Sequence, residues 1–480
     1  MIAFPFILNS LLNFAIGLLV ARYLGPGEYG QYALALSIAV VMQTFAFDWL
    51  RLCATRFYSE HDRRDRPEIR ATLNAVFSAL TGVFVCAAIV IALSGLDLPL
   101  SGGLIALAIV SAIANGWFDF SAALARARFN NRAYGTLVVV KIVLSISLSV
   151  GGAWYFGSAK IALAGLVLSV AGSLAATHRV LRDQDATMRR ADRKLALRYA
   201  LYALPIVVAN VLYQAVPAAD RAWISEVHGF AQAGQLALAF EIGIRIIGAI
   251  GSALDVLLFQ VAVLAEKTLG EEAARRQVAR NMGVQLAILV PAVAGCWIVL
   301  PSFEHVLVPE SFRGPFAHYF TLLLPAIQCF AVSNYCLGPA FQIAHRTMPL
   351  IAGGLAAVAA NGLAVLLLPA TADASGIAMA QSISSTAGLA VTIGFLFTLE
   401  PMWPSARDIA GTLTGTGAML LAAMPLRAME PGWIPLLAQA TLGAFVYALA
   451  VLVFDVAQVR TMLLTMVAPG RTDLFSWKPR

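Results

Sequence analysis

The sequence predicts an all-α integral membrane protein with about fourteen transmembrane helices, arranged as two pseudo-symmetric six-helix lobes and a terminal helix pair. Composition is the first observation behind this prediction. Of the 480 residues, 60% are hydrophobic and only 12% are charged, and the mean hydropathy is +0.79. A soluble chain of this length needs more polar surface, so nearly all of it is expected to lie in lipid. An internal repeat and an uneven distribution of positive charge are the other two observations.

The helices are predicted from apolar segments of about 20 residues, which are long enough to cross roughly 30 Å of hydrocarbon. The first segment could be mistaken for a signal peptide, but it lacks a basic start and its repeat partner lies in mid-chain, so it counts as a helix. The fourteen segments are 2–21, 30–52, 71–94, 101–124, 134–156, 160–178, 200–218, 231–258, 282–301, 316–340, 349–369, 375–398, 408–426 and 433–455.

A motif near the start of the chain returns 204 positions later. Gly25-x-x-x-x-Gly30-Gln31-x-Ala33-Leu34-Ala35-Leu36 reappears as Gly229-x-x-x-x-Gly234-Gln235-x-Ala237-Leu238-Ala239-Phe240. The offset spans six helices, so the repeats run parallel and are related by an axis along the membrane normal. The predicted division is an N-terminal lobe with a basic linker (1–198), a C-terminal lobe (199–400), and helices 13–14 with a cytoplasmic tail (401–480). A substrate site is expected between the two lobes.

Positive charge predicts the orientation. With the N-terminus in the cytoplasm, cytoplasmic segments hold 26 Lys and Arg residues and the opposite loops hold five, namely Arg22, Lys160, Arg221, Arg313 and Arg427. This bias favours both termini inside. It also accounts for the net charge of +7, because the excess lies against the anionic inner leaflet. Nucleic-acid binding is therefore a poor explanation of the basic composition.

Two short stretches carry a family resemblance. Ala21-Arg22-Tyr23-Leu24-Gly25-Pro26-Gly27-Glu28-Tyr29-Gly30-Gln31-Tyr32 resembles the signature that follows helix 1 in bacterial polysaccharide flippases of the Wzx type. Asp48-Trp49-Leu50-Arg51, then Ala54-Thr55-Arg56-Phe57-Tyr58, is similar to the family's end of helix 2. Helix count, charge map and duplication extend the resemblance over almost the full length. These flippases share a superfamily with the lipid II flippases and the multidrug MATE exporters.

The resemblance implies a MATE-like fold and a transporter rather than an enzyme. It would export a polyprenyl-pyrophosphate-linked oligosaccharide across the bacterial inner membrane by alternating access, for surface polysaccharides such as lipopolysaccharide or exopolysaccharide. The implied partners are this lipid-linked substrate, membrane lipids, and a polysaccharide polymerase with its co-polymerase. With no nucleotide-binding motif, transport would be driven by ion gradients, membrane potential or product removal.

Two alternatives remain open. A cation-coupled MATE-type drug exporter would be expected to carry a titrating acid in helix 1, and helix 1 has none. An integral-membrane glycan polymerase or ligase would resemble chains with a large periplasmic loop, which is absent here.

Ionisable residues inside membrane helices usually face a cavity or a partner, so they are the candidate substrate-cavity residues. Glu241 and Arg245 lie four positions apart in helix 8 and share one face. Arg245 would attract a pyrophosphate or an acidic sugar; a self-neutralising structural pair is the alternative. Lys141 and Asp119 lie at similar depths in helices 5 and 4, where they would form an ion pair that serves the cavity or only the structure.

Asp48, like Asp119, sits between two aromatic residues near a cytoplasmic helix end. Such a group could contact a lipid headgroup, although an interfacial aromatic anchor is the commoner cause. Asparagines in the helices, including Asn13 and Asn361, are interpreted as contacts between helices.

The repeat also predicts two gating pairs. Arg22 corresponds to Glu226 at the periplasmic end, and Arg51 corresponds to Asp255 at the cytoplasmic end. If they meet across the lobes, Arg22–Glu226 would latch the inward-open state and Arg51–Asp255 the outward-open state. Alternatively, Arg51 pairs with Asp48 on its own helix, and residues 22 and 226 are solvated.

No cofactor or metal site is predicted. The five cysteines form no C-x-x-C pair, and the six histidines are scattered singly, without metal spacing. Asp183-Gln184-Asp185 matches the D-x-D of metal-dependent glycosyltransferases, but it lies in a basic loop and is interpreted as solvated.

Overall fold

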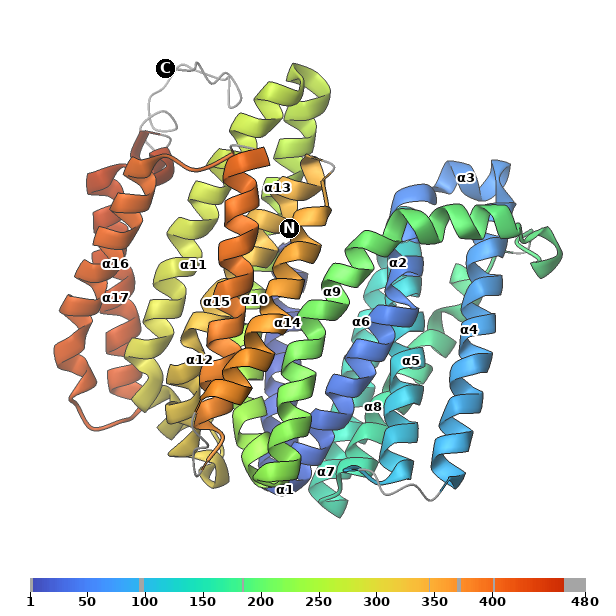
Figure 1. Ribbon diagram of the computed structural model, residues 1–480, viewed down its shortest axis with the longest axis horizontal. Coiled ribbons are helices and arrows are strands. Elements are labelled where there is room, and N and C mark those ends of the chain that lie inside the picture. The colour runs from blue at the N-terminus through green and yellow to red at the C-terminus, as the bar shows by residue number, and fades with distance from the viewer. Residues whose placement is uncertain are drawn as a thin grey trace. The chain divides into compact units, whose positions relative to one another are not determined.

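The computed structural model describes residues 3–94, 99–183, 185–344, 346–368, 373–399 and 402–461. Within these ranges every regular element is a helix (Figure 1). Twelve helices there are long and apolar enough to cross a membrane, and a bent pair at the start of the chain raises the number to 13. The predicted class, an all-α integral membrane protein, is confirmed, and the predicted count of fourteen is approximate. The predicted tail beyond residue 461 lies outside the described residues.

The first two predicted helices meet at a kink and are separate helices on either side of it. Helix α1 (Ala3–Ala46) contains Gly25, whose φ of 70° and ψ of 172° break the helical geometry. Helix α2 (Asp48–Phe57) follows after a bend of 46°. The predicted loop between the first two segments is therefore mostly helical, and the change of direction is concentrated at a residue without a Cβ.

The chain divides into two compact units. Unit 1 comprises residues 1–249, 308–326 and 346–392, and unit 2 comprises 250–307, 327–345 and 393–480. The predicted lobe boundaries at residues 198 and 400 stay a prediction.

Unit 1 holds α1 and α2 together with the helices that follow them. These are α3 (Glu60–Asp65), α4 (Pro67–Leu93), α5 (Gly102–Ala127), α6 (Asn131–Leu144), the π-helical η1 (Ser145–Val150), α7 (Gly151–Phe156), α8 (Ala159–Leu181), η2 (Met188–Arg190), α9 (Arg193–Val227), the first half of α10 (Phe230–Leu269), η3 (Glu310–Phe312), most of α12 (Pro315–Ala331), α14 (Met348–Leu367) and most of α15 (Ser375–Leu399). Polar caps begin α6 and α9: the Asn130 side chain accepts from the Ala133 amide at 3.0 Å, and the Asp192 side chain accepts from the Lys194 amide at 2.8 Å.

Unit 2 holds the remaining elements. These are the second half of α10, α11 (Glu271–Leu307), the end of α12 with the π-helical η4 (Val332–Leu337) and α13 (Gly338–Ile343), the end of α15, α16 (Ala406–Arg427), α17 (Trp433–Phe454) and η5 (Val456–Gln458). Helices α16 and α17 pack side by side and both contact α11 (Figure 1).

An aromatic core joins α2, α4 and α5 in unit 1. The ring of Phe47 stacks on that of Phe77 at 4.6 Å between centroids, and Phe77 stacks on Phe120 at 5.8 Å. All three side chains are buried. Phe47 and Phe120 are therefore core residues. Trp49 and Phe118, the other aromatic neighbours of Asp48 and Asp119, are only partly buried, and their role as interfacial anchors stays a prediction. Phe47 and Phe120 stand next to Asp48 and Asp119 in the sequence because the apolar core at this point needs large aromatic side chains.

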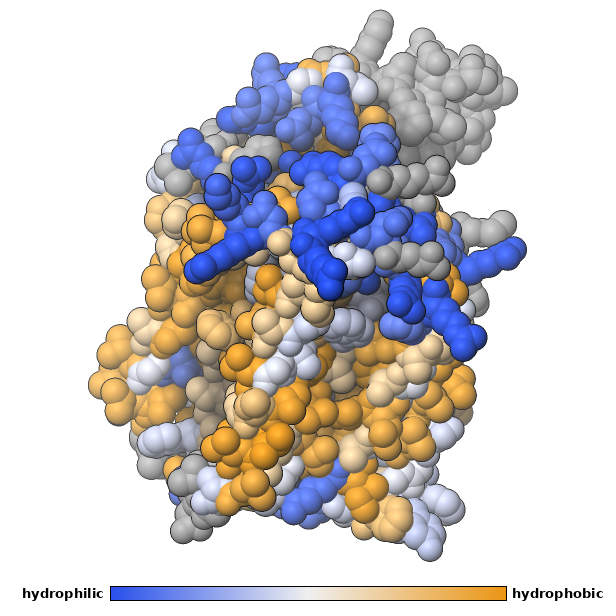
Figure 2. Space-filling view, turned by 90° about the vertical axis from the view of Figure 1, so that its right-hand side faces the viewer, coloured by the Kyte–Doolittle hydropathy of each residue, from blue (hydrophilic) through white to orange (hydrophobic). Residues whose placement is uncertain are grey.

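Positively charged segments gather at one end of unit 1, which we call its basic end: residues 51–70, 126–132 and 179–198. Arg63 and Arg128 both bind Asp183, and the Asp192 amide donates to the Thr72 hydroxyl at 2.9 Å. On the face shown in Figure 2, hydrophilic residues cover this end and a hydrophobic band lies next to it. The grouping agrees with the charge map from which the orientation is predicted.

The orientation itself can be tested by labelling single cysteines placed in a cysteine-free version of the chain. We expect cytoplasmic labelling at positions 63, 188 and 273, and periplasmic labelling at 158 and 228, because the Lys and Arg bias places the basic loops inside. Membrane-impermeant maleimide on intact cells makes the measurement, and permeabilised cells are the control. A periplasmic label at position 188 would contradict the orientation. Positions 97 and 372, also predicted to be periplasmic, lie outside the described residues.

Candidate functional site

The two copies of the repeated motif pack directly against each other. A Cβ added at Gly30 would overlap the carbonyl oxygen of Phe230, and one added at Gly234 would overlap the carbonyl oxygen of Pro26. Residues 26 and 230 are themselves 204 positions apart, so the contact is symmetric. The glycines that open each copy, Gly25 and Gly229, have φ values of 70° and 84°. The pseudo-two-fold axis therefore passes between Gly30 and Gly234.

Three charged side chains lie near this axis, and we call them the axial cluster: Arg221, Glu241 and Arg245. An Nη2 atom of Arg221 lies 3.1 Å from Oε1 of Glu241, and Nε of Arg245 lies 3.4 Å from Oε2. Arg221 also donates to the Ser37 hydroxyl, and Nη1 of Arg245 donates to the Asn13 carbonyl at 2.6 Å. Two guanidinium groups share one carboxylate, which leaves one formal positive charge.

Arg221 corrects a sequence prediction. The apolar pattern places it in a loop on the far side of the membrane, but it lies within α9 and only 8% of its side chain is exposed. The side chains of Glu241 and Arg245 are 35% and 36% exposed, so both border open space. The buried Arg221 contacts Glu241 on its other side. The predicted i, i+4 pair exists in this conformation, and its role in a substrate cavity stays a prediction.

The first copy of the repeat has small or uncharged residues at the positions that correspond to the axial cluster. The residues 204 positions before Arg221, Glu241 and Arg245 are Gly17, Ser37 and Val41. A Cβ added at Gly17 would come within 2.9 Å of Nη1 of Arg245, so a larger residue there would displace the guanidinium. Ser37 accepts a hydrogen bond where its counterpart is an acid. The charge is therefore contributed by the second copy alone, and the first copy contributes space and a hydroxyl.

Lys141 and Asp119 share a second site in unit 1, the inner pocket, of about 140 Å³. They do not form the predicted direct ion pair in the described part of the chain. Gln43 donates to Oδ2 of Asp119 at 2.7 Å, and Nζ of Lys141 lies 4.1 Å from the centroid of the Phe118 ring. The aromatic ring attracts the ammonium group, and the amide satisfies the carboxylate.

Asn13 connects the inner pocket with the axial cluster. It lines the inner pocket, and its carbonyl accepts from Arg245. Arg126 and Tyr134 line the same pocket, with the guanidinium 5.6 Å from the ring centroid. The structure thus places Lys141 and Asp119 in one pocket and Glu241 and Arg245 in the axial cluster, and Asn13 contacts both. The sequence alone suggests only a contact between helices for Asn13.

Asp48, the fifth predicted cavity residue, binds Arg51 instead. Nε of Arg51 lies 2.6 Å from Oδ1 of Asp48 and Nη2 lies 3.0 Å from Oδ2, a bidentate pair on one helix. This is the alternative that the sequence leaves open for Arg51. Arg22 and Glu226 are both exposed, and within the described residues no ion pair joins them. The Arg22–Glu226 latch is therefore not formed in this conformation of unit 1, and both latches stay predictions for other conformations.

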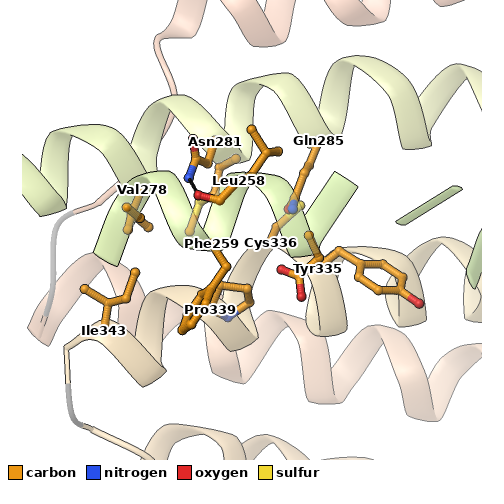
Figure 3. Close-up of a pocket in the computed structure, with 12 residues that line it drawn as sticks. Leu258, Phe259, Val278, Asn281, Gln285, Tyr335, Cys336, Pro339 and Ile343 are labelled. Carbon is orange, nitrogen blue, oxygen red and sulfur yellow. Dashed lines mark hydrogen bonds between the residues drawn. The ribbon is translucent and has the colours of Figure 1, made fainter. Parts of the chain in front are cut away.

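Asp255 belongs to unit 2, where it lines a small pocket of about 10 Å³ with side chains from α11 and η4 (Figure 3). The volume is about that of one water. Asn281 donates to the Leu258 carbonyl at 2.7 Å, whereas Oδ1 of Asp255 has no hydrogen-bond partner among the described residues. Among those residues no three His, Cys, Asp or Glu side chains gather as a metal-binding group.

Sequence reasoning misses another buried acid. Asp220 in α9 is 2% exposed, and its Oδ2 accepts from Nδ2 of Asn361 in α14 at 3.3 Å. It is easily overlooked because it lies next to Arg221 near a predicted helix end, where the two resemble loop residues. A signal is nevertheless available: Pro217 lies inside the helix, and an apolar pattern continues beyond it to Val227.

Comparison with known proteins defines the fold. The chain is similar to a lipid II flippase MurJ in an inward closed conformation, with a TM-score of 0.70 at 12% identity, over 95% of this chain and 98% of that one. It is also similar to an inward-facing MATE multidrug transporter of the MOP superfamily (TM-score 0.60, 14% identity, 81% and 93% covered). A third similar structure is the MATE multidrug transporter DinF-BH (TM-score 0.58, 13% identity, 84% and 95% covered).

No family model matches the sequence. No curated protein matches it either. The fold is nevertheless that of the MurJ and MATE transporters, a class of multi-pass membrane proteins, and it covers nearly the whole chain.

Proposed function

We propose that the protein is a flippase that moves polyprenyl-pyrophosphate-linked oligosaccharides across the bacterial inner membrane by alternating access. The axial cluster is the observation that carries this proposal. Its net positive charge lies inside a membrane protein, where an unneeded charge is costly. The likeness to a lipid II flippase in fold supports it, and so does the sequence resemblance to polysaccharide flippases.

In this proposal Arg245 binds the pyrophosphate. Its guanidinium is part exposed and held by Glu241 and the Asn13 carbonyl, which leaves donors free to turn toward a ligand. A guanidinium matches the planar spacing of phosphate oxygens and makes strong charge-assisted hydrogen bonds. Lys141 and Arg126 in the inner pocket add positive charge along the path of the glycan. The polyprenyl tail would stay in lipid.

Asp220 is proposed to couple transport to an ion gradient. It is 2% exposed, and it accepts its hydrogen bond from a neutral amide. An ionised carboxylate in such a setting is poorly stabilised, so a bound cation or proton would lower its energy. The next residue, Arg221, belongs to the axial cluster and lies in the same helix, α9. A shift of α9 on ion binding at Asp220 would therefore also move a residue of the substrate site.

We expect Asp220→Asn to remove the acceleration of transport by an imposed sodium or proton gradient. The asparagine keeps the shape and can still pair with Asn361, so the fold should be preserved. Proteoliposomes with and without each gradient provide the measurement, and Asp185→Asn, an exposed loop carboxylate, is the matched control. An Asp220→Asn protein that still responds to the gradient as the wild type does would rule out this role.

The alternative is a MATE-type drug exporter, because two MATE transporters have a similar fold. A net positive site favours an anionic substrate and opposes a cationic drug. Purified protein in vesicles, given either a fluorescent polyprenyl-pyrophosphate glycan or a cationic dye, separates the two. We expect movement of the glycan only; movement of the dye alone would establish the exporter.

The proposed setting is the inner membrane, with both termini cytoplasmic and a polymerase and co-polymerase as partners.

A further inference from the structure

A second cationic site lies at the basic end of unit 1, away from the axial cluster. It is an open pocket of about 500 Å³ where α5 turns into α6, beside α3 and the end of α8. Three arginines (Arg63, Arg128 and Arg132), two asparagines (Asn130 and Asn131) and Phe129 line it. The proposed function uses none of these residues.

The floor of this pocket is rigid. Arg128 is buried and donates through Nε and Nη2 to the Tyr58 hydroxyl, at 3.1 and 2.7 Å, and through Nη2 to Asp183 at 2.5 Å. Tyr58 donates to the same carboxylate at 2.5 Å. Burial and the neighbouring Asp183 raise the pKa of Tyr58 to about 12, so the phenol keeps its proton. The contacts fix Arg128 in place before any ligand arrives.

The pocket carries excess positive charge. Asp183 binds both Arg128 and Arg63, at 2.5 and 2.7 Å, so one carboxylate faces two guanidinium groups. Arg132 is exposed and has no hydrogen bond or ion pair within the described part of the chain. Three arginines line the pocket and Asp183 neutralises only part of their charge, so the pocket attracts an anionic group.

Phe129 gives the pocket an apolar rim. Its side chain is 88% exposed, and its φ of 52° is a left-handed conformation that favours glycine and costs a phenylalanine about 1 kcal/mol. Neither packing nor backbone geometry explains this residue here. An aromatic ring beside arginines suits the boundary between lipid headgroups and acyl chains.

An apolar surface continues from this rim along α6 and α8, which pack together. Val139 and Val143 on α6 and Leu168 on α8 are exposed. Val143 follows Arg132 by eleven residues, roughly 16 Å along a helix, which is about half of the 30 Å hydrocarbon thickness. If a lipid phosphate binds at Arg132, the exposed apolar surface from there to Val143 is about as long as one acyl chain.

We propose that this pocket binds the headgroup of an anionic phospholipid, with the phosphate at Arg132 and Arg63 and the glycerol and upper acyl chain against Phe129. Free phosphate shares the charge, but only a lipid also covers the apolar rim and the α6–α8 surface. The inference does not depend on the proposed transport function.

The test compares phosphatidylglycerol with phosphatidylcholine, each added to the full-length protein purified in detergent. We expect phosphatidylglycerol to raise the melting temperature and phosphatidylcholine to leave it unchanged. Arg132→Gln should weaken phosphatidylglycerol binding about fivefold, since one arginine near a membrane surface is worth about that factor. Arg56→Gln, which removes an exposed arginine of α2 that does not line the pocket, should bind as the wild type does.

Phe129→Gly separates binding from folding. Glycine relieves the left-handed strain, so the lipid-free protein should melt at the same or a higher temperature, while the stabilisation by phosphatidylglycerol should fall. Equal lipid stabilisation of wild type and both pocket variants would overturn the site. Equal stabilisation by the two lipids would do the same. An identical shift with inorganic phosphate alone would make it a site for a free anion and would also overturn the proposal.

Discussion

Arg245→Ala is expected to abolish glycan export in cells while the protein still accumulates in the membrane. The guanidinium is the part-exposed cation of the axial cluster, and a charge-assisted contact with phosphate contributes about 1.5–3 kcal/mol, or roughly ten- to a hundredfold in affinity. The fold should survive, because the alanine leaves Glu241 paired with Arg221 at 3.1 Å. Surface glycan and membrane-inserted protein, measured in the same cells, provide the readout.

Two variants at the same cluster sharpen this prediction. Arg245→Lys keeps the charge but loses the planar pair of donors, so export should fall only in part. Glu241→Gln keeps both cations and should be milder than Arg245→Ala, although it removes the charge that holds Arg221. Normal export by the Arg245→Ala protein would exclude pyrophosphate binding at this residue.

Gly30→Ala should strongly destabilise the protein. The new Cβ would overlap the backbone carbonyl of Phe230, and a backbone atom cannot rotate aside, so the two copies of the motif would have to separate. Overpacking of this kind costs about 1–3 kcal/mol or more. The melting temperature in detergent and the yield of monodisperse protein should both fall. Gly234→Ala should behave alike, because it meets the Pro26 carbonyl.

Gly27→Ala is the matched control within the same motif. Nothing lies within 4 Å of a Cβ at Gly27, so this variant should be as stable as the wild type or slightly more stable. If Gly27→Ala and Gly30→Ala melted together near the wild-type temperature, the close contact of the two repeats would be wrong.

Most of the helices could be predicted from the sequence because lipid imposes a simple rule on length and polarity. Predicted segments such as 160–178 and 433–455 correspond to α8 (Ala159–Leu181) and α17 (Trp433–Phe454). The rule fails where a helix extends past the apolar core: α9 runs to Val227, nine residues beyond its predicted end at 218. Arg221 lies in that extension, so the rule assigns a buried member of the axial cluster to a loop.

Pairings are harder to predict than positions. Glu241 and Arg245 can be paired from the sequence because helical spacing brings them together, but Arg221 and Ser37 join them from elements far away in sequence. Asp183 shows the same limit. The sequence predicts a solvated loop there, yet its side chain is buried and binds Arg128 and Arg63, because the ends of α3, α5 and α8 meet at that point. Nothing local marks such a contact.

The small residues opposite the axial cluster bear on how such a chain could have arisen. In a symmetric pair of identical subunits, every residue occurs on both sides of the axis. Two copies of the second repeat would place an arginine where Gly17 now lies, and that position is already filled by Arg245. Two copies of the first would bring glycine, serine and valine to the axis, with no charge at all. Gene fusion removes this restriction, because each side can then mutate alone. The cluster is thus a feature that two identical subunits cannot encode, and its origin is expected to follow the divergence of the two copies.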